Sequence, residues 1–172
     1  MRTSWEAVLT NIEAGSVAPD LSLRGLDGQQ HSLQDLLKHG PVVLGFFKIS
    51  CPVCQFTFPF LQRISSRFAG KRVTVVGVSQ DDQKGTKEFN QQFGITFLTL
   101  LDQKPYPASN AYGLTSVPTV FLIEPDSKVK ISLMGFDKAG LENISHHLAA
   151  RENIAARPLF LPTEKVPAHK PG

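Results

Sequence analysis

Apolar runs of strand length alternate along this chain with segments in which apolar residues recur at helical spacing. The clearest runs are Val42 to Ile49 (VVLGFFKI), Val73 to Ser79 (VTVVGVS) and Thr119 to Ile123 (TVFLI). A continuous apolar run of this length is typical of a strand whose two faces are both covered. The pattern therefore predicts a sheet that is buried on both sides.

The segment after the first run has the spacing of an amphipathic helix. Apolar side chains recur at every fourth position, at Phe56, Phe60, Ile64 and Phe68, so one face of the helix would be apolar. Pro59 lies inside this segment and should bend the helix, because proline removes one backbone hydrogen bond. Further helices are expected over Leu33 to Lys38, Lys84 to Phe93, Tyr106 to Tyr112 and Lys138 to Arg151, and further strands over Phe97 to Leu101 and Val129 to Leu133.

Two shorter elements precede the first run. Ser4 to Ala14 carries apolar residues on one side and is expected to form a short helix. Leu21 to Leu33 alternates around the turn dipeptide Asp27-Gly28, which predicts a β-hairpin. The order of all these elements indicates an α/β sandwich with a mixed central sheet.

The chain is long enough for one domain with a substantial core. It has 172 residues, of which 41% are hydrophobic and 19% are charged, and this composition suits a single soluble domain. We place this domain at residues 1–152. Residues 153–172 include four prolines between Arg157 and Gly172, and we expect them to form an extended or disordered tail.

Charge and hydropathy argue against two classes of function. The formal net charge is +3 and the Lys and Arg residues are scattered, so no binding of nucleic acid is expected. No apolar stretch approaches the about 20 residues that cross a bilayer, so no membrane span is expected. Met1 to Gly15 lacks the continuous apolar core of a signal peptide, which favours a cytoplasmic location. A periplasmic or extracytoplasmic location would require a leader ahead of this sequence.

The chain has two cysteines, Cys51 and Cys54, in the stretch FFKISCPVCQF. Three roles compete for such a pair: half a zinc site, a structural disulfide, or a redox dithiol. Structural zinc needs four ligands. There is no further Cys, and the adjacent His146 and His147 would diverge by about 100° on a helix. A purely structural disulfide is uncommon inside cells. Neither a metal nor another cofactor is therefore expected.

A redox dithiol suits this position better. Cys51 lies between a predicted buried strand and a helix, where free backbone N–H groups and the helix dipole stabilise a thiolate and lower a thiol pKa. Pro52 suits the first helical turn, because its missing N–H would have had no partner there. Cys54, one turn later, is placed to attack a mixed disulfide on Cys51. The motif and its context predict a redox-active CxxC centre.

Pro118 comes directly before the predicted strand Thr119 to Ile123. A cis X–Pro bond is rare, about 5–6% of such bonds, and usually marks a tight turn. A trans proline at the first residue of a strand is also allowed. The residues alone leave these two alternatives open.

With these motifs in place, the chain resembles the thioredoxin superfamily. It is most similar to the branch related to the alkyl hydroperoxide reductase/thiol-specific antioxidant (redoxin) group. Gly15 to Leu23 (GSVAPDLSL) is similar to the opening segment of that branch, and Tyr112 to Ile123 (YGLTSVPTVFLI) to a later one. The resemblance covers Gly15 to Ala150. It implies a thioredoxin-like three-layer α/β/α sandwich with an N-terminal β-hairpin extension.

The same resemblance implies roles for three residues. Cys51 would be the attacking thiol and Cys54 the resolving thiol. Pro118 would be a cis-proline beside them. With Pro118 cis and packed against the CxxC turn, we predict that the Val117 backbone binds an extended substrate segment by strand addition.

Two positions depart from the family pattern at the expected base. Gly45 stands where thioredoxin keeps a buried Asp, and Thr57 stands where membrane-linked relatives keep a Glu. The acid that assists proton transfer at Cys54 is therefore missing from both usual positions.

Three further departures lie around the first cysteine. Ser50 replaces the usual Trp, and Pro52-Val53 replaces Gly-Pro. Lys48 is an unusual cation near Cys51, either a partner of the thiolate or an ordinary lysine at the end of a strand. We expect Lys48, Ser50 and Pro52 to modulate the dithiol.

The leading hypothesis is a thiol–disulfide oxidoreductase that exchanges disulfides through the CxxC dithiol. Its expected partners are a disulfide-bearing protein or a small thiol or disulfide, and a reductant whose identity the sequence does not give. The second hypothesis is a thiol-dependent peroxidase with antioxidant activity. Peroxiredoxins carry Pro and Thr where this chain has Leu44 and Lys48, which weakens that case. The third is a non-catalytic thioredoxin-like binding domain.

Overall fold

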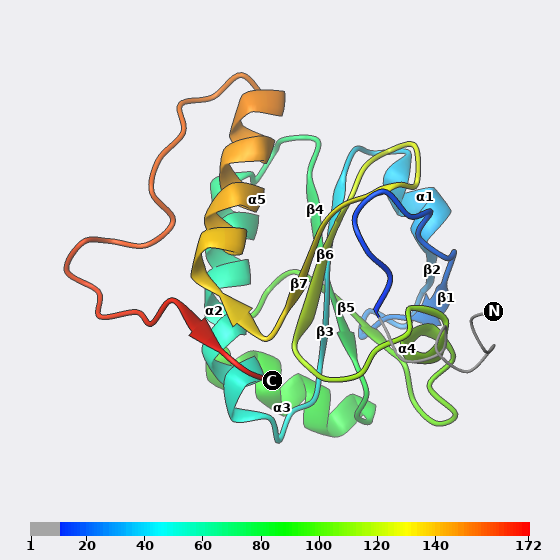
Figure 1. Cartoon of the computed structure of the whole chain (residues 1–172). Coiled ribbons are helices and arrows are strands. Elements are labelled where there is room, and N and C mark those ends of the chain that lie inside the picture. Colours follow the sequence, from blue (N-terminus) through cyan, green and yellow to red (C-terminus); the bar gives the residue numbers. More distant parts are fainter. Residues whose placement is uncertain (1–10) are drawn as a thin grey trace, which may run out of the picture.

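The computed structural model describes residues 11–172, and its centre is a five-stranded sheet with strand order β5-β4-β3-β6-β7 (Figure 1). Neighbouring strands β3, β4 and β5 are parallel, whereas β6 and β7 pair antiparallel. The mixed sheet predicted from the sequence is therefore confirmed. The strands are β3 (Val42–Phe47), β4 (Thr74–Ser79), β5 (Leu98–Leu101), β6 (Thr119–Ile123) and β7 (Val129–Met134).

The central strand β3 shows why the apolar runs have no polar side. Every residue of β3 is buried, and successive side chains of a strand point to opposite faces. Val43 and Phe47 pack into a core cluster on one face of the sheet. Val42, Leu44 and Phe46 pack into a second cluster on the other face. With a core on both faces, β3 carries no polar side chain.

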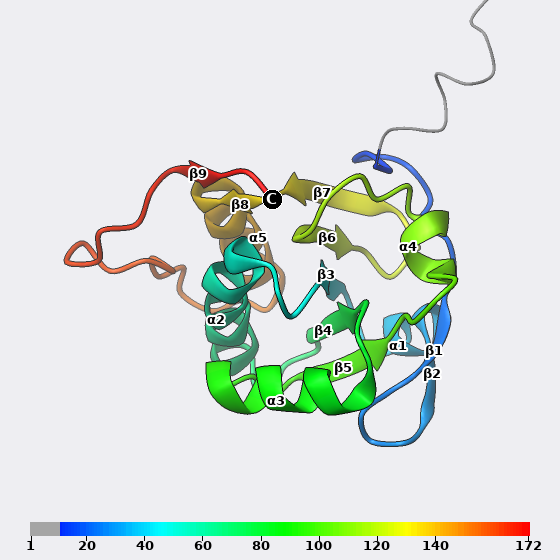
Figure 2. The same cartoon turned by 90° about the horizontal axis from the view of Figure 1, so that it is seen from below.

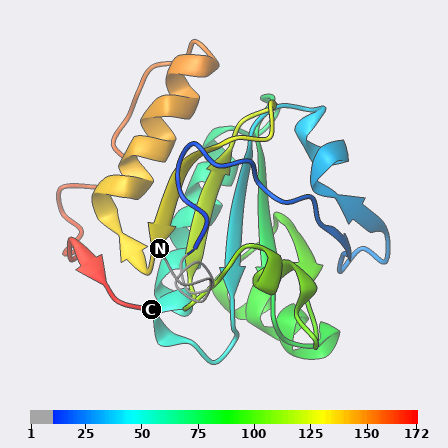
Figure 3. The ribbon, with the colours of Figure 1, turned by 45° about the vertical axis from the view of Figure 1, so that its right-hand side comes forward.

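Helices cover both faces of the sheet (Figures 1 and 2). One face carries α2 (Pro52–Arg67), α3 (Gln83–Phe93) and α5 (Lys138–Arg151). The other face carries α1 (Leu33–Leu37), α4 (Pro107–Ala111) and the hairpin of β1 (Ser22–Arg24) and β2 (Gln30–Ser32), as Figure 3 also shows. These layers confirm the three-layer sandwich and its N-terminal hairpin.

Local hydrogen bonds set the helix starts that the sequence predicted. Ser32 Oγ accepts from Asp35 N at 3.1 Å and begins α1. Asp137 Oδ1 accepts from Gly140 N at 2.9 Å and begins α5, because a side-chain acceptor at this position satisfies a free helical N–H. Residues 11–14 form no helix, and the rest of the helix predicted from Ser4 to Ala14 lies outside the described residues.

The segment after α5, residues 153–172, is extended and lies against the domain. It contains one two-residue strand, β9 (His169–Lys170), which pairs with β8 (Phe136–Asp137). Its Leu159 and Phe160 are buried in the cluster beneath α2 and α5. Within residues 11–172, no helix has the length and apolar character that crossing a membrane requires.

Candidate active site

Cys51 stands at the start of α2. Its backbone is extended (φ −83°, ψ 114°), and its Sγ accepts a hydrogen bond from the Cys54 backbone N–H at 3.2 Å. The sulfur thus serves as the N-terminal cap of the helix, where unsatisfied N–H groups and the helix dipole favour negative charge. Cys51 is half-buried, so part of the residue is exposed to solvent.

Cys54 lies one turn into α2 and is fully buried at 0% exposure. Burial raises the pKa of the Cys54 thiol, and the hydrogen bond to Cys51 and the charge of Asp81 raise it further, whereas hydrogen bonding to the Lys48 backbone lowers it. A buried thiol resists ionisation because a thiolate is poorly solvated there. The two cysteines therefore differ in access: Cys51 is half-buried, whereas Cys54 is fully buried and its thiol resists ionisation.

Val117 and Pro118 lie beside the dithiol, although they are far from it in the sequence. Cys51 Sγ donates to the Val117 carbonyl oxygen at 3.5 Å. The Val117–Pro118 bond is cis, as the resemblance implied. Antiparallel pairing of β6 with β3 brings Thr119 opposite Phe46, so the start of β6 meets the end of β3. The fold therefore assembles Cys51, Cys54 and the Val117–Pro118 pair at one end of the sheet.

The three residues expected to modulate the dithiol surround Cys51. Lys48 and Ser50 are exposed on the preceding loop, and Pro52 is exposed at the first position of α2. The Lys48 carbonyl accepts from Cys51 N at 3.2 Å. The Lys48 side chain is exposed, and this hydrogen bond to the site is made by the Lys48 backbone.

Two polar residues outside the predicted site hold this loop. Asp81 Oδ2 accepts from Ile49 N at 2.8 Å, and Gln55 Nε2 donates to the Ile49 carbonyl at 2.9 Å. Asp81 follows β4, the parallel neighbour of β3. The carboxyl ends of adjacent parallel strands meet at one edge of a sheet, and this order of elements was the available indication that Asp81 lies near the dithiol.

Neither of the two positions that usually carry an acid provides one here, and both lie in tightly packed surroundings. A Cβ on Gly45 would lie 2.9 Å from Leu61 Cδ1, so a side chain at this position would require Leu61 to shift. Thr57 is fully buried, and its Oγ1 donates to the Val53 carbonyl at 2.7 Å. In the part of the chain that the structure describes, no three or more His, Cys, Asp or Glu side chains are grouped so that they could hold a metal ion.

A dithiol at the first turn of a helix, next to a cis-proline on this α/β/α sandwich, defines the class of thioredoxin-fold thiol–disulfide oxidoreductases. Residues 14–132 match the AhpC/TSA family, and the chain belongs to that family. The resemblance that the sequence motifs indicated is therefore confirmed.

Individual relatives carry names of the same class. Thiol-disulfide oxidoreductase ResA of Geobacillus thermodenitrificans is 32% identical over 140 residues, which are 81% of this chain and 78% of that protein. A solved structure, a putative thiol:disulfide interchange protein DsbE from Chlorobium tepidum, is 28% identical with a TM-score of 0.72 over 81% of this chain and 97% of that chain. The putative peroxiredoxin bcp of Helicobacter pylori is 35% identical over 108 residues, 61% of this chain and 70% of that protein.

Proposed function

We propose that this oxidoreductase works by thiol–disulfide exchange in which Cys51 attacks and Cys54 resolves. One observation carries the assignment: Cys51 is partly exposed and caps the helix, whereas Cys54 is fully buried. The attacking thiol must be accessible to a disulfide that arrives from solvent. The resolving thiol needs to reach only the Cys51 sulfur, so it can be buried.

The reaction conserves electrons between substrate and protein. The Cys51 thiolate attacks one sulfur of the substrate disulfide, that S–S bond breaks, and the second sulfur leaves as a thiolate that takes up a proton. Cys54 then gives up its proton and attacks Cys51 Sγ, which releases the first substrate sulfur. The substrate gains two electrons and two protons, and the Cys51–Cys54 disulfide forms. A dithiol reductant must return the protein to its reduced state.

The helix start supports the first step. The Cys54 N–H already points at Cys51 Sγ at 3.2 Å. A backbone donor and the positive end of the helix dipole stabilise a sulfur anion. Lys48, Ser50 and Pro52 modulate this thiolate from the loop and the first helical position, with Lys48 adding positive charge near the site.

Resolution is the slower step in this scheme. Cys54 has to ionise although its pKa is raised by burial, and neither Gly45 nor Thr57 provides a base. General-base assistance requires a group within hydrogen-bond reach of the proton. Release of the mixed disulfide therefore speeds up as the pH rises and Cys54 ionises.

Val117 and Pro118 form the docking position for the substrate. The Val117 carbonyl lies 3.5 Å from Cys51 Sγ, so a chain that passes along Val117 holds its disulfide above the attacking sulfur. The partners are a disulfide-bearing protein or a small disulfide.

A thiol peroxidase is the second candidate, because the putative peroxiredoxin bcp of Helicobacter pylori is a relative at 35% identity. In that case a peroxide would oxidise the Cys51 thiolate to a sulfenic acid, and Cys54 would condense with it to the disulfide and water. Leu44 and Lys48, at positions where peroxiredoxins carry Pro and Thr, argue against this activity.

One set of assays separates the candidates. Disulfide reduction and hydrogen peroxide consumption are measured with the unaltered chain and with Cys51→Ser. The proposal predicts disulfide reduction that is lost in Cys51→Ser, and peroxide consumption slower by orders of magnitude. Faster reaction with peroxide than with disulfide would favour the peroxidase. If neither substrate reacts in a Cys51-dependent way, the remaining candidate is a non-catalytic binding domain.

A further inference from the structure

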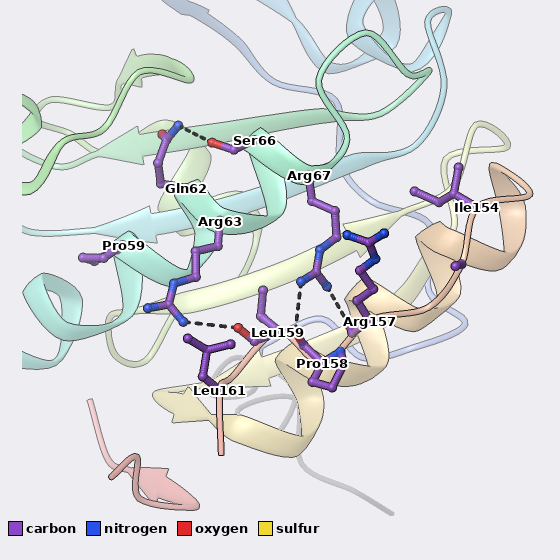
Figure 4. Close-up of a pocket in the computed structure, with 11 residues that line it drawn as sticks. Pro59, Gln62, Arg63, Ser66, Arg67, Ile154, Arg157, Pro158, Leu159 and Leu161 are labelled. Carbon is purple, nitrogen blue, oxygen red and sulfur yellow. Dashed lines mark hydrogen bonds between the residues drawn. The ribbon is translucent and has the colours of Figure 1, made fainter. Parts of the chain in front are cut away.

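The segment after α5 is tied along α2 by arginines (Figure 4). Arg67 Nη1 donates to the Arg157 carbonyl at 2.7 Å, and Arg67 Nη2 donates to the Pro158 carbonyl at 2.9 Å. One turn earlier, Arg63 forms a two-point ion pair with Glu164 at 2.8 and 2.6 Å. These contacts fix the course of the segment between Arg157 and Glu164.

From there the segment returns to the end of the sheet at which α2 begins (Figures 1 and 2). Lys138 N donates to the Ala168 carbonyl at 3.0 Å. Strand β9 pairs with β8, so that Lys170 lies opposite Phe136. The Lys170 ammonium stands 4.5 Å from the centre of the Phe56 ring on α2. Residues 168–172 are thus held beside the helix that carries the dithiol.

The last of these residues contacts the proposed docking position. A Cβ on Gly172 would lie 2.9 Å from the Val117 carbonyl carbon and 3.4 Å from Pro118 Cδ, so Gly172 touches the Val117–Pro118 backbone. The approach also depends on Gly135, which has φ +68° and whose Cβ would lie 3.1 Å from Gly172 N. A side chain at either position would push the segment away.

The contact falls on the Val117 backbone, and Cys51 keeps part of its surface exposed. The Val117 carbonyl that Gly172 approaches is the same oxygen that accepts from Cys51 Sγ at 3.5 Å. A protein substrate that pairs with Val117 would have to occupy the place of Gly172. A small disulfide needs access to Cys51 alone, and Cys51 remains half-buried.

We infer that residues 168–172 determine the substrate class of the dithiol, admitting low-molecular-weight disulfides and keeping extended protein segments from the Val117 docking position. This inference rests on the proposed thiol–disulfide exchange. Protein disulfides react through the minor population in which the segment is displaced, and their rate falls by that fraction.

Deletion of residues 168–172 tests the inference in single-turnover reactions. The reduced chain is mixed with bis(2-hydroxyethyl) disulfide or with insulin, quenched with acid, and the fraction of Cys51–Cys54 disulfide is followed by mass spectrometry. The ratio of the insulin rate constant to the small-disulfide rate constant should rise at least about tenfold in the deletion variant, which corresponds to about 1.4 kcal/mol.

A full-length variant guards against misfolding of the deletion variant. Lys170→Ala removes the contact with Phe56 and should raise the same ratio by roughly twofold to fivefold, the size of an exposed cation–π interaction. Lys165→Ala is the matched control, because Lys165 is an exposed lysine of the same segment. The control should leave the ratio unchanged.

The outcomes distinguish the inference from the proposed function. An unchanged ratio in both the deletion variant and Lys170→Ala, with the small disulfide still reacting, overturns the inference and leaves the exchange reaction intact. A parallel rise for both substrates also overturns it, because it would indicate a general shield over Cys51. If neither disulfide oxidises the dithiol in any variant, the proposed function fails and the inference falls with it.

Discussion

Replacing Phe160 by alanine tests whether the segment after α5 belongs to the folded core. The Phe160 side chain is 5% exposed, and its ring centre lies 4.7 Å from that of Phe60 and 5.9 Å from that of Phe136. Lys138 Nζ stands 5.7 Å from the same ring. The substitution therefore removes a ring that joins the segment to α2 and β8.

The expected loss follows from this burial. Truncation of a buried Phe lowers the free energy of unfolding by about 3–5 kcal/mol. For a chain of this size each kcal/mol shifts Tm by about 2–4 °C, so Phe160→Ala should lower Tm by about 6–20 °C. Urea denaturation and a thermal scan of the reduced protein measure both quantities.

The neighbouring residue supplies the control. Leu161 is 57% exposed, so Leu161→Ala should change the free energy of unfolding by no more than about 0.5 kcal/mol. A loss in Phe160→Ala as small as that of the control would refute the packing of this segment. The inference about residues 168–172 would then lose its anchor.

Three further predictions concern the dithiol. Near neutral pH, iodoacetamide should modify Cys51 of the reduced protein first, because Cys54 is buried and its pKa is raised. Faster modification of Cys54, found by peptide mapping, would reverse the roles assigned to the two cysteines. Asp81→Asn keeps an acceptor for Ile49 N but removes a charge that raises the pKa of Cys54. Release of the mixed disulfide should therefore be faster in this variant at a given pH, and an unchanged pH–rate profile would exclude the influence of Asp81. Lys48 should favour the reduced form, so the reduction potential of the Cys51–Cys54 disulfide should be higher than that of thioredoxin, about −270 mV. A potential at or below that value, measured by equilibration with glutathione, would contradict the claim.

The elements with strong local patterns were predictable. The apolar run of β3 and the spacing in α2 each have one interpretation, because few other arrangements bury such side chains. The bounds of α5, Lys138–Arg151, agree with the prediction. The Asp27-Gly28 turn likewise gave the hairpin of β1 and β2.

The packing of the segment after α5 was not predictable in the same way. Its prolines favour extended backbone in any setting, and its contacts depend on partners far away in the sequence, such as Arg63 for Glu164. The apolar pair Leu159-Phe160 was the one local indication that part of it is buried. Strands as short as β8 and β9 carry too few residues for a recognisable period.

In the candidate site, too, local motifs were predictable and contacts between distant segments were not. Cys51 and Cys54 are a local motif, so the sequence alone marked them. The placement of Asp81 depends on β4 lying beside β3, and the contact of Gly172 with Val117 depends on the whole course of the segment. Both required the tertiary structure.

Trapping of the mixed disulfide tests the central claim, that Cys51 attacks and Cys54 resolves, most directly. Reduced Cys54→Ser is mixed with bis(2-hydroxyethyl) disulfide, and the products are located by mass spectrometry under non-reducing conditions. The account predicts a stable adduct on Cys51 in this variant, an intramolecular Cys51–Cys54 disulfide without adduct in the unaltered chain, and a much slower reaction in Cys51→Ser. A Cys54 adduct that forms in Cys51→Ser as fast as the Cys51 adduct forms in Cys54→Ser would contradict the account.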